Sequence, residues 1–431
     1  LAQALGHLVA LAEQSRQLPT GATPDELASA YTQHGWQVDD AALQSLASVH
    51  TREDTEAVSA ALRGLYLPWL QESARRLQHA AQAQAGLHHP AAVASTASTC
   101  TVFIDGLRYD VAQHLAQRLQ ALGEVRISHQ WTCLPSVTAS GKPWCSPIAS
   151  AITGQPEDTE FNPRVAADGK PLSSYHFERV LAEHDIQKLK STETGDPQGR
   201  AWAEAGDLDH YGHEHGIRLA KDMAQQLDHI LERLNELWDA GWTCLRIVTD
   251  HGWLLLPGGL PKSELPRHQT ETRWGRCAVL KDSAMGTPLT FGWSWCDTVQ
   301  IAFAPGVCSF VAGAEYAHGG LSLQESLVPV IELRRGKNAP ASIQATITDI
   351  TWKGLRCIVQ VESSAPDLRV DIRTKAASAD TSIVANPKRL ESGKANLAVA
   401  DDGDEGCAAV VVVLSANGQV IQKRPTTVGE P

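Results

Sequence analysis

Long hydrophobic runs are missing from this sequence. The longest apolar stretch, Cys407 to Leu414, is far too short to cross a bilayer. No charged and then apolar segment opens the chain, so neither secretion nor membrane insertion is expected, and a cytoplasmic protein is predicted. Because the first residue is Leu and not Met, we expect the sequence to be a piece of a longer protein.

Positive charge is also scarce. The chain has 37 Lys and Arg against 49 Asp and Glu, and its net charge is −12. This balance argues against a protein coated with basic surface for long duplex DNA, although bound metal ions could still create a local anion site. The nine cysteines are scattered and form no C-x-x-C pair. Neither a disulfide framework nor a cysteine zinc site is indicated, and buried reduced thiols are expected.

The composition, 43% hydrophobic and 20% charged, is that of a globular protein, and the length predicts two or three domains. Residues 1–95 are expected to form a helical segment. Thr23-Pro24-Asp25-Glu26 is typical of a helix start with a capping box. Val58, Leu62, Leu65 and Trp69 then recur at helical spacing, and Pro68 is expected to bend or end that helix.

Residues 96–337 alternate between strand and helix patterns. Residues 101–104 are predicted to form a strand, and residues 110–122 a helix. A second helix, with Leu219 and Leu237 near its ends, is predicted before a strand at 244–249. This alternation predicts an α/β domain with a mostly parallel sheet. From 338 to 431 the helical pattern is lost, and short strand candidates predict a small β-sandwich: Ser342–Ile350, Leu355–Glu362, Leu368–Thr374 and Ala408–Leu414.

Polar residues directly after the two predicted strands are the first candidates for a functional site. Asp105 follows the strand 101–104, and Asp250-His251 follows the strand 244–249. In open α/β sheets, ligands bind outside the carboxyl ends of the strands. Asp105 alone is also typical of a turn or a helix cap, but adjacent Asp and His residues offer an oxygen and a nitrogen ligand from one turn.

Two further segments carry potential metal ligands. Residues 209–216 (DHYGHEHG) contain three His, and their glycines favour a loop that folds Asp209 and His213 around one point; a solvated polar loop is the alternative. His318 lies beside two glycines and could equally be structural. Together these residues supply three carboxylates and three imidazoles, a mixture that suits zinc or manganese better than calcium. Six ligands suit two ions, which could clamp an in-line displacement at phosphorus.

A hydroxyl nucleophile could come from residues 134–143 (LPSVTASGKP), although Ser- and Thr-rich turns are common. A metal-bound hydroxyl can lose its proton near neutral pH without an adjacent base. Two divalent ions would balance three carboxylates and one alkoxide. The loaded site would then be near neutral and would not repel a phosphodiester, whereas the empty cluster would.

The order of these elements resembles the alkaline phosphatase superfamily, with a D-x-x-G-H-x-x-G pattern at 209–216 like that of its nucleotide pyrophosphatase/phosphodiesterases. The segments 248–262, 266–277 and 316–325 are similar to PglZ proteins, which belong to the BREX phage-defence systems of bacteria. The resemblance covers about residues 100 to 335. It implies an alkaline-phosphatase-like α/β/α sandwich, and the chain looks like the C-terminal part of such proteins.

The resemblance also implies roles for individual residues. Thr138 stands at the position of the threonine nucleophile. One ion, most simply zinc with manganese as the alternative, would be held by Asp209, His213 and His318. The other would be held by Asp105, Thr138, Asp250 and His251. The phosphodiesterases continue after their threonine with Phe-Pro-Asn, which this chain lacks. Four residues could replace that Asn in stabilising the charge on the phosphoryl group, and the alternative is that they are ordinary surface residues. They are Lys142, Arg267, His268 and Arg273.

The resemblance therefore predicts a metal-dependent phosphodiesterase or nuclease that acts in phage defence. Its substrate would be a phosphodiester such as a short oligonucleotide, and its partners would be other BREX components, including a DNA methyltransferase and a small accessory protein. The alternative is a structural or docking component of that complex, with metals that hold the fold. A phosphomutase or a sulfatase-like hydrolase is less favoured, because the loop around Thr138 does not show the C/S-x-P-x-R pattern of sulfatases.

Overall fold

The computed structural model describes residues 1–87, 95–281, 289–335, 345–363, 367–376, 378–415, 418 and 420–430, without the side chains of Arg267 and Asp380. The chain divides into two compact units. The first contains residues 1–238 and 242–336, and the second contains residues 239–241 and 337–431. The helical region and the central sheet thus lie in the same unit, and the expected boundary at 337/338 falls outside the described residues.

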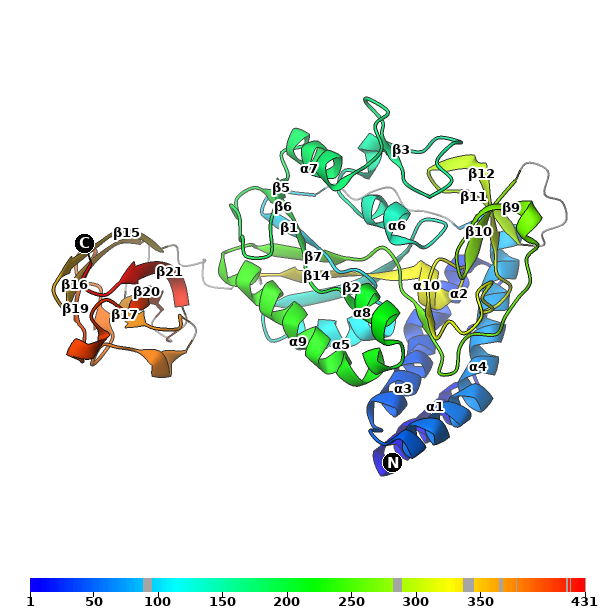
Figure 1. The fold of residues 1–431 in the computed structure, drawn as a ribbon, viewed down its shortest axis with the longest axis horizontal. Coiled ribbons are helices and arrows are strands. Elements are labelled where there is room, and N and C mark those ends of the chain that lie inside the picture. The colour runs from blue at the N-terminus through cyan, green and yellow to red at the C-terminus, as the bar shows by residue number, and fades with distance from the viewer. Residues whose placement is uncertain are drawn as a thin grey trace. The chain divides into compact units, whose positions relative to one another are not determined.

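Four helices form the N-terminal region, drawn in blue in Figure 1: α1 Ala2–Gln14, α2 Pro24–Ala30, α3 Trp36–Ala47 and α4 Arg52–Ala83. The predicted capping box is confirmed, because the Thr23 hydroxyl accepts from the Glu26 amide and the Glu26 carboxylate accepts from the Thr23 amide. The expectation that Pro68 might end α4 was wrong. Side chains buried on both sides of it, such as Tyr66 and Leu77, hold the helix in place despite the lost hydrogen bond.

A buried carboxylate ties this helical region to the rest of its unit. Asp39 accepts hydrogen bonds from the hydroxyls of Tyr31, at 2.6 Å, and Tyr66. It also accepts from the Gln324 amide, at 3.0 Å. Gln78 of α4 donates to the carbonyl oxygen of Leu321 at 3.0 Å. Gln324 and Leu321 belong to the segment that follows His318, so α3 and α4 are joined to that segment by buried hydrogen bonds.

The central sheet has the order β2-β14-β7-β1-β6-β5. Its strands are β1 Thr99–Phe103, β2 Glu124–Trp131, β5 Gln187–Lys188, β6 Arg200–Glu204, β7 Cys244–Val248 and β14 Leu327–Arg334. β1 pairs in parallel with both β6 and β7, and β5 with β6, while β14 is antiparallel to β7 and β2. The fold is therefore α/β with a mixed sheet, and the predicted parallel strands at β1 and β7 are confirmed.

Helices cover both faces of this sheet (Figure 1). They are α5 Tyr109–Leu119, α6 Thr138–Trp144, α7 Ser174–Glu183, α8 Leu208–His215, α9 Arg218–Asp239 and the short α10 Leu323–Ser326. Figure 1 shows α6 and α7 on one side of the sheet and α5 and α9 on the other. On the α7 side, Phe103, Trp202 and Val248 form a buried cluster with Phe177 and Val180. No helix in the described parts of the chain is long and apolar enough to span a membrane.

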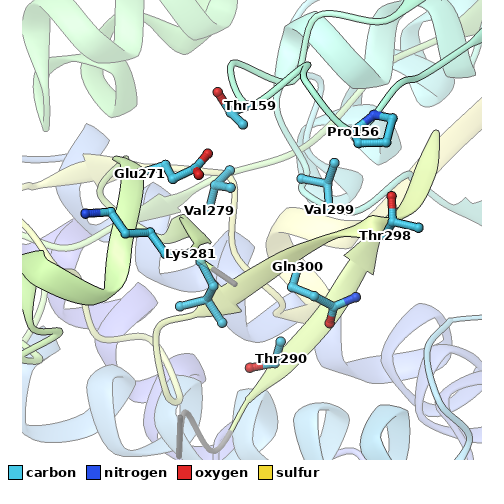
Figure 2. A pocket seen from close by; sticks show the side chains of 10 residues that line it. Pro156, Thr159, Glu271, Val279, Lys281, Thr290, Thr298, Val299 and Gln300 are labelled. Carbon is cyan, nitrogen blue, oxygen red and sulfur yellow. The ribbon is translucent and has the colours of Figure 1, made fainter. Parts of the chain in front are cut away.

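A smaller antiparallel sheet of order β11-β12-β10-β9 lies in the same unit: β9 Thr270–Arg273, β10 Cys277–Leu280, β11 Thr290–Trp293 and β12 Cys296–Phe303. Trp293 and Trp295 donate their indole N–H to Ser140 in α6, which fixes this sheet beside the Thr138 segment. A pocket of about 580 Å³ opens on it, between Pro156, Glu271, Lys281 and Gln300 (Figure 2). None of the candidate site residues lines this pocket.

Two antiparallel sheets form the second unit. They contain β15 Ala345–Lys353, β16 Arg356–Ser363 and β19 Lys394–Ala398, and β17 Arg369–Arg373, β18 Lys388–Arg389, β20 Ala408–Leu414 and β21 Val420–Thr427. Val359 of the first sheet and Val411 of the second belong to one buried cluster, as in a sandwich. The start of the strand predicted from Ser342 lies outside the described residues. The remaining short strands are β3 Ile152–Thr153, β4 Arg164–Val165, β8 Leu254–Leu255 and β13 Tyr316–Ala317.

Candidate metal centre

The carboxyl edge of the central sheet brings together the residues that follow β1 and β7. These strands are neighbours, with Phe103 opposite Val248, so Asp105 and Asp250 leave the sheet side by side. Asp250 Oδ1 accepts hydrogen bonds from the amides of His251, at 3.0 Å, and Gly106, at 3.4 Å. One oxygen of this buried carboxylate is thus fixed by the backbone, and the other is left free to bind a ligand.

Asp105, Asp250 and His251 form the first ligand group, with one ligand atom from each within 4.8 Å of the others. His251 Nε2 lies 3.7 Å from Asp105 Oδ1 and 3.6 Å from Asp250 Oδ2. Both oxygens are buried, and neither has a hydrogen-bond partner among the described residues. An unpaired buried carboxylate oxygen is costly, and a metal ion is the kind of partner that would compensate two of them at once. The donor set therefore fits a divalent cation.

Asp209 and His213 lie on a helix, and the expectation of a loop at 209–216 was wrong. α8 begins after Asp207, whose side chain accepts from the His210 amide, and ends at Gly216. Gly212 stays helical because the Tyr316 ring packs against it, and a Cβ there would lie 2.3 Å from that ring. The spacing of four residues places Asp209 and His213 on one helix face, with Oδ2 3.5 Å from Nε2.

The second ligand group is Asp209, His251 and His318, again with ligand atoms within 4.8 Å. His318 Nε2 lies 3.3 Å from Asp209 Oδ1 and 3.0 Å from His213 Nε2. His213 is thus beside the group, although half of its side chain is exposed. The rings of His251 and His318 stack with centroids 3.8 Å apart, so the two groups meet at His251.

Backbone carbonyls fix the orientation of both stacked imidazoles. His251 Nδ1 lies 3.0 Å from the carbonyl oxygen of Gly252, and His318 Nδ1 lies 3.1 Å from that of Ser136. A carbonyl can only accept, so each Nδ1 carries the proton and each Nε2 offers a lone pair to the centre. This arrangement is typical of metal-binding histidines, whose second nitrogen donates to a carbonyl or carboxylate.

The carboxylates and imidazoles shift each other's pKa values. Burial, together with the charge of Asp250, raises the pKa of Asp105 from 3.8 to about 8. Burial lowers the pKa of His318 to about 4, and the neighbouring charge of His251 acts in the same direction. Burial alone would lower the pKa of His251, but Asp250, Asp209 and Asp105 outweigh it and raise that pKa. Without metal, the cluster holds protons that a cation would displace.

The hydroxyl of Thr138 points at this cluster. Thr138 is the first residue of α6, and its Oγ1 lies 3.1 Å from His251 Nε2. The helix can approach so closely because Gly141 has no side chain; a Cβ there would lie 2.7 Å from the Cβ of Asp250. The fold therefore brings all seven predicted metal and nucleophile residues to one place.

The four predicted substrate-binding residues have different surroundings. Lys142 forms an ion pair with Glu204, at 2.9 Å. Arg273 donates to the carbonyl oxygens of Leu265, at 3.2 Å, and Phe310, so the backbone engages its guanidinium. His268 is exposed in a short 3-10 helix at 267–269, and the side chain of Arg267 lies outside the described set.

Two supporting interactions were not recognised in the sequence. The Tyr316 hydroxyl donates to Asp209 Oδ1 at 2.8 Å and so orients this carboxylate. The buried Arg276 forms a two-pronged ion pair with Glu325, which also accepts from the Gly320 amide and so holds the segment after His318. Tyr316 lies two residues before His318, but no spacing rule relates a tyrosine to a carboxylate more than a hundred residues away.

The pKa shifts predict an unusual pH dependence for the metal-free protein. Between pH 6.5 and 8 the unfolded chain has lost the proton of Asp105, whereas the folded cluster still holds it. The raised pKa of His251 acts in the same direction. Folding stability should therefore fall as pH rises through this window, by up to about 1.4 kcal/mol per pH unit for each retained proton. His318 is neutral in both states there and adds no slope. Thermal unfolding after metal removal measures this. Asp105→Asn should flatten the slope, and an unchanged slope in that variant would contradict the assignment.

Two glycine substitutions should change stability in opposite directions. Gly212→Ala forces a Cβ into the Tyr316 ring and should destabilise the protein by about 1–3 kcal/mol. Gly64→Ala in α4 is the matched control, because nothing lies within 4 Å of its Cβ position. It should stabilise by about 0.5–1 kcal/mol, since alanine loses less backbone entropy in a helix. Chemical denaturation of both variants checks this; equal effects would mean that the Tyr316 contact is not tight.

One of the known structures to which this chain is similar is that of murine ectonucleotide pyrophosphatase/phosphodiesterase 5. The match has a TM-score of 0.35 and 13% identity, and covers 54% of this chain and 87% of that one. Phosphonoacetate hydrolase from Sinorhizobium meliloti, in complex with phosphonoformate, matches with a TM-score of 0.35 and 12% identity, over 59% and 95% of the two chains. No family model matches the chain, and no curated protein matches its sequence. At such low scores and identities, the chemistry of the site has to be argued from its own residues.

Proposed function

We propose that this protein is a metal-dependent phosphodiesterase of the alkaline phosphatase type, with Thr138 as its nucleophile. The observation that carries the proposal is the convergence of two unpaired buried carboxylate oxygens, three imidazoles and one hydroxyl at the carboxyl edge of the sheet. Side chains that only stabilise the fold would be expected to satisfy each other. These leave acceptor atoms directed at a common point, which is what a cation site requires.

Two divalent ions fit this donor set. Asp105, Asp250 and His251 would hold one of them, together with the Thr138 oxygen. Asp209, His318 and His213 would hold the other. Mixed carboxylate and imidazole ligands suit zinc or manganese. Such ions would act as Lewis acids on the phosphoryl oxygens and on the attacking hydroxyl.

The proposed reaction has two steps, and both change the bonds at Thr138 Oγ1. Thr138 Oγ1 attacks phosphorus, its bond to phosphorus forms, and the bond from phosphorus to the leaving alcohol breaks. The hydroxyl proton is lost and the alcohol oxygen gains one. Water then cleaves the threonine–phosphorus bond and restores the hydroxyl. Asp250, fixed by two backbone amides, and His251, fixed by the Gly252 carbonyl, keep the centre rigid during both steps.

Charge balance is compatible with a phosphodiester substrate. Asp105, Asp209 and Asp250 give three negative charges when ionised, and two divalent ions with a threonine alkoxide bring the total to zero. A neutral site does not repel a phosphodiester, which carries one negative charge. Without the ions no Lewis acid polarises the phosphoryl oxygens or the Thr138 hydroxyl, so activity should depend strictly on metal.

The biological setting belongs to the same proposal. The segments 248–262, 266–277 and 316–325 support a PglZ-type role in BREX phage defence, in the cytoplasm, beside a DNA methyltransferase and a small accessory protein. Two of these segments contribute directly to the site: the first contains Asp250 and His251, and the third contains Tyr316 and His318. An oligonucleotide is then the natural phosphodiester.

A metal-reconstitution assay tests the proposed activity. The protein is stripped with a chelator, and hydrolysis of bis(p-nitrophenyl) phosphate is followed after addition of zinc, manganese or calcium. We expect no turnover in the stripped protein, recovery with zinc or manganese, and two ions per chain by elemental analysis. If two ions bind and neither the diester nor an oligonucleotide is hydrolysed, the centre is structural and the proposed reaction is wrong.

A further inference from the structure

A second charged cluster lies at the carboxyl edge of the sheet, outside the ligand groups. Glu204, the last residue of β6, accepts hydrogen bonds from Lys142 at 2.9 Å and from Lys188. It also accepts from the Trp202 indole at 3.3 Å. The two lysines come from different elements, α6 and β5. Glu204 thus gathers two ammonium groups at one point. Burial acts to raise its pKa, but the lysines overcome this and lower the pKa to about 2, so the carboxylate stays ionised.

This cluster is next to the metal centre along the sheet. β6 pairs directly with β1, and Glu204 lies opposite Phe103, two residues before Asp105. Neighbouring strands are about 4.8 Å apart, so the backbone of Glu204 lies one strand spacing from Phe103, and Asp105 follows two residues further along the chain from β1. Lys142 is also four residues after Thr138 in α6, and such residues share a helix face. Its ammonium lies 5.0 Å from the centre of the Phe103 ring.

The cluster has spare binding capacity for an anion. Two ammonium groups and one carboxylate leave one net positive charge. Each ammonium has three N–H donors, and the contacts to Glu204 use one from each. The three side chains are between about a quarter and two fifths exposed, so a ligand can reach them. A simple structural ion pair would need only one lysine.

We propose that Lys142 and Lys188, gathered by Glu204, bind a second phosphate group of the substrate beside the scissile one. This inference rests on the proposed function and specifies its substrate class: phosphodiesters that carry a neighbouring phosphate, as in a single-stranded nucleic acid. A diester without such a neighbour would use only the metal centre. Glu204 is a positioning residue, since it holds the lysines and does not itself touch the anion.

The test measures how salt affects binding of a labelled single-stranded pentanucleotide. Thr138→Ala serves as the parent protein, loaded with zinc, so that hydrolysis does not interfere. Each phosphate contact adds about 0.7 to the slope of log Kd against log salt for a single strand. Because the two lysines bind one phosphate, Lys142→Gln combined with Lys188→Gln should lower the slope by about 0.7 and weaken binding at low salt. Lys170→Gln, which removes another lysine paired with a carboxylate, should change neither.

Glu204→Gln separates anion binding from a structural role. It keeps both lysines and one side-chain oxygen that can accept from them, and it removes the negative charge that opposes an anion, so it should bind the pentanucleotide at least as tightly as the parent. If it weakens binding as much as the lysine variants do, or if the double lysine variant keeps the parent slope, the inference is overturned. Absence of pentanucleotide binding by the parent also overturns it.

Hydrolysis gives an independent readout in the Thr138 protein. We compare kcat/KM for a dinucleotide that carries a terminal phosphate with kcat/KM for the same dinucleotide without it. The first value should be about ten times the second, and this ratio should fall toward one in the double lysine variant. An equal ratio in both proteins contradicts the subsite but leaves the phosphodiesterase standing. Absence of any hydrolysis contradicts the phosphodiesterase, while the binding slopes still decide the subsite.

Discussion

Replacing Thr138 by alanine is expected to lower kcat for a phosphodiester by at least about a thousandfold, because removal of a covalent nucleophile leaves only binding and electrostatic stabilisation. The bound ions should remain, since Asp105, Asp250 and His251 still provide a ligand group. Steady-state kinetics and elemental analysis on the same sample separate the two effects. Thr138→Ser keeps a hydroxyl at the first position of α6 and should retain a substantial part of the activity.

Thr153→Ala is a suitable control for this experiment, because that half-buried threonine lies on β3 and is not among the candidate ligands. It should leave kcat unchanged. Rapid quenching of the unsubstituted protein should also give, by mass spectrometry, a Thr138 peptide that carries the phosphoryl group still esterified to the retained alcohol. Turnover by the alanine variant at the original rate would show that water, and not Thr138, attacks phosphorus.

Replacing Asp250 by asparagine should have opposite effects on metal binding and on the stability of the metal-free protein. Asparagine is nearly the same size and can keep the Oδ1 hydrogen bonds from the amides of Gly106 and His251. It presents an NH₂ group, which cannot ligate, in place of the unpaired Oδ2. Metal affinity should fall by more than about 100-fold, because even the outer partners of metal ligands contribute 10- to 100-fold.

The metal-free protein should meanwhile become more stable. Burial raises the pKa of Asp250, so above the pKa of the unfolded state its ionised form favours unfolding. Asparagine removes that charge. Calorimetric zinc titration and thermal unfolding at pH 7 measure both effects. Asp228→Asn, at an exposed residue paired with Arg118, should change neither. Unaltered zinc affinity in Asp250→Asn would remove this residue from the centre.

The positions of the candidate ligands that follow strands could be predicted because a strand and the residue after it are visible in a short stretch of sequence. Asp105 and Asp250 each follow a short apolar run, and parallel strands place such residues at one edge. The partners in the sheet could not be predicted in the same way. β2 has a mostly exposed pattern, and its neighbour β14 begins nearly two hundred residues later. Nothing in either segment specifies such a distant partner.

The helix α8 shows a different limit. Two glycines and several polar residues locally favour a loop at 209–216, which was the expectation. The Tyr316 ring fills the space beside Gly212, which is a tertiary contact, and the side chain of Asp207 caps the helix start, which is a local helix signal. Tyr316 itself was overlooked for the same reason, since its role depends on contact with Asp209 and not on sequence spacing.

The hydrogen bonds from Gln324 to Asp39 and from Gln78 to Leu321 have a consequence for how this protein could be shortened or regulated. The segment that bears His318 rests on side chains from α3 and α4, so removing those helices would strip buried polar atoms of their partners beneath the second ligand group. The N-terminal helices therefore support the segment that carries His318, and we expect a displacement of α3 or α4 to change the geometry of the second ligand group.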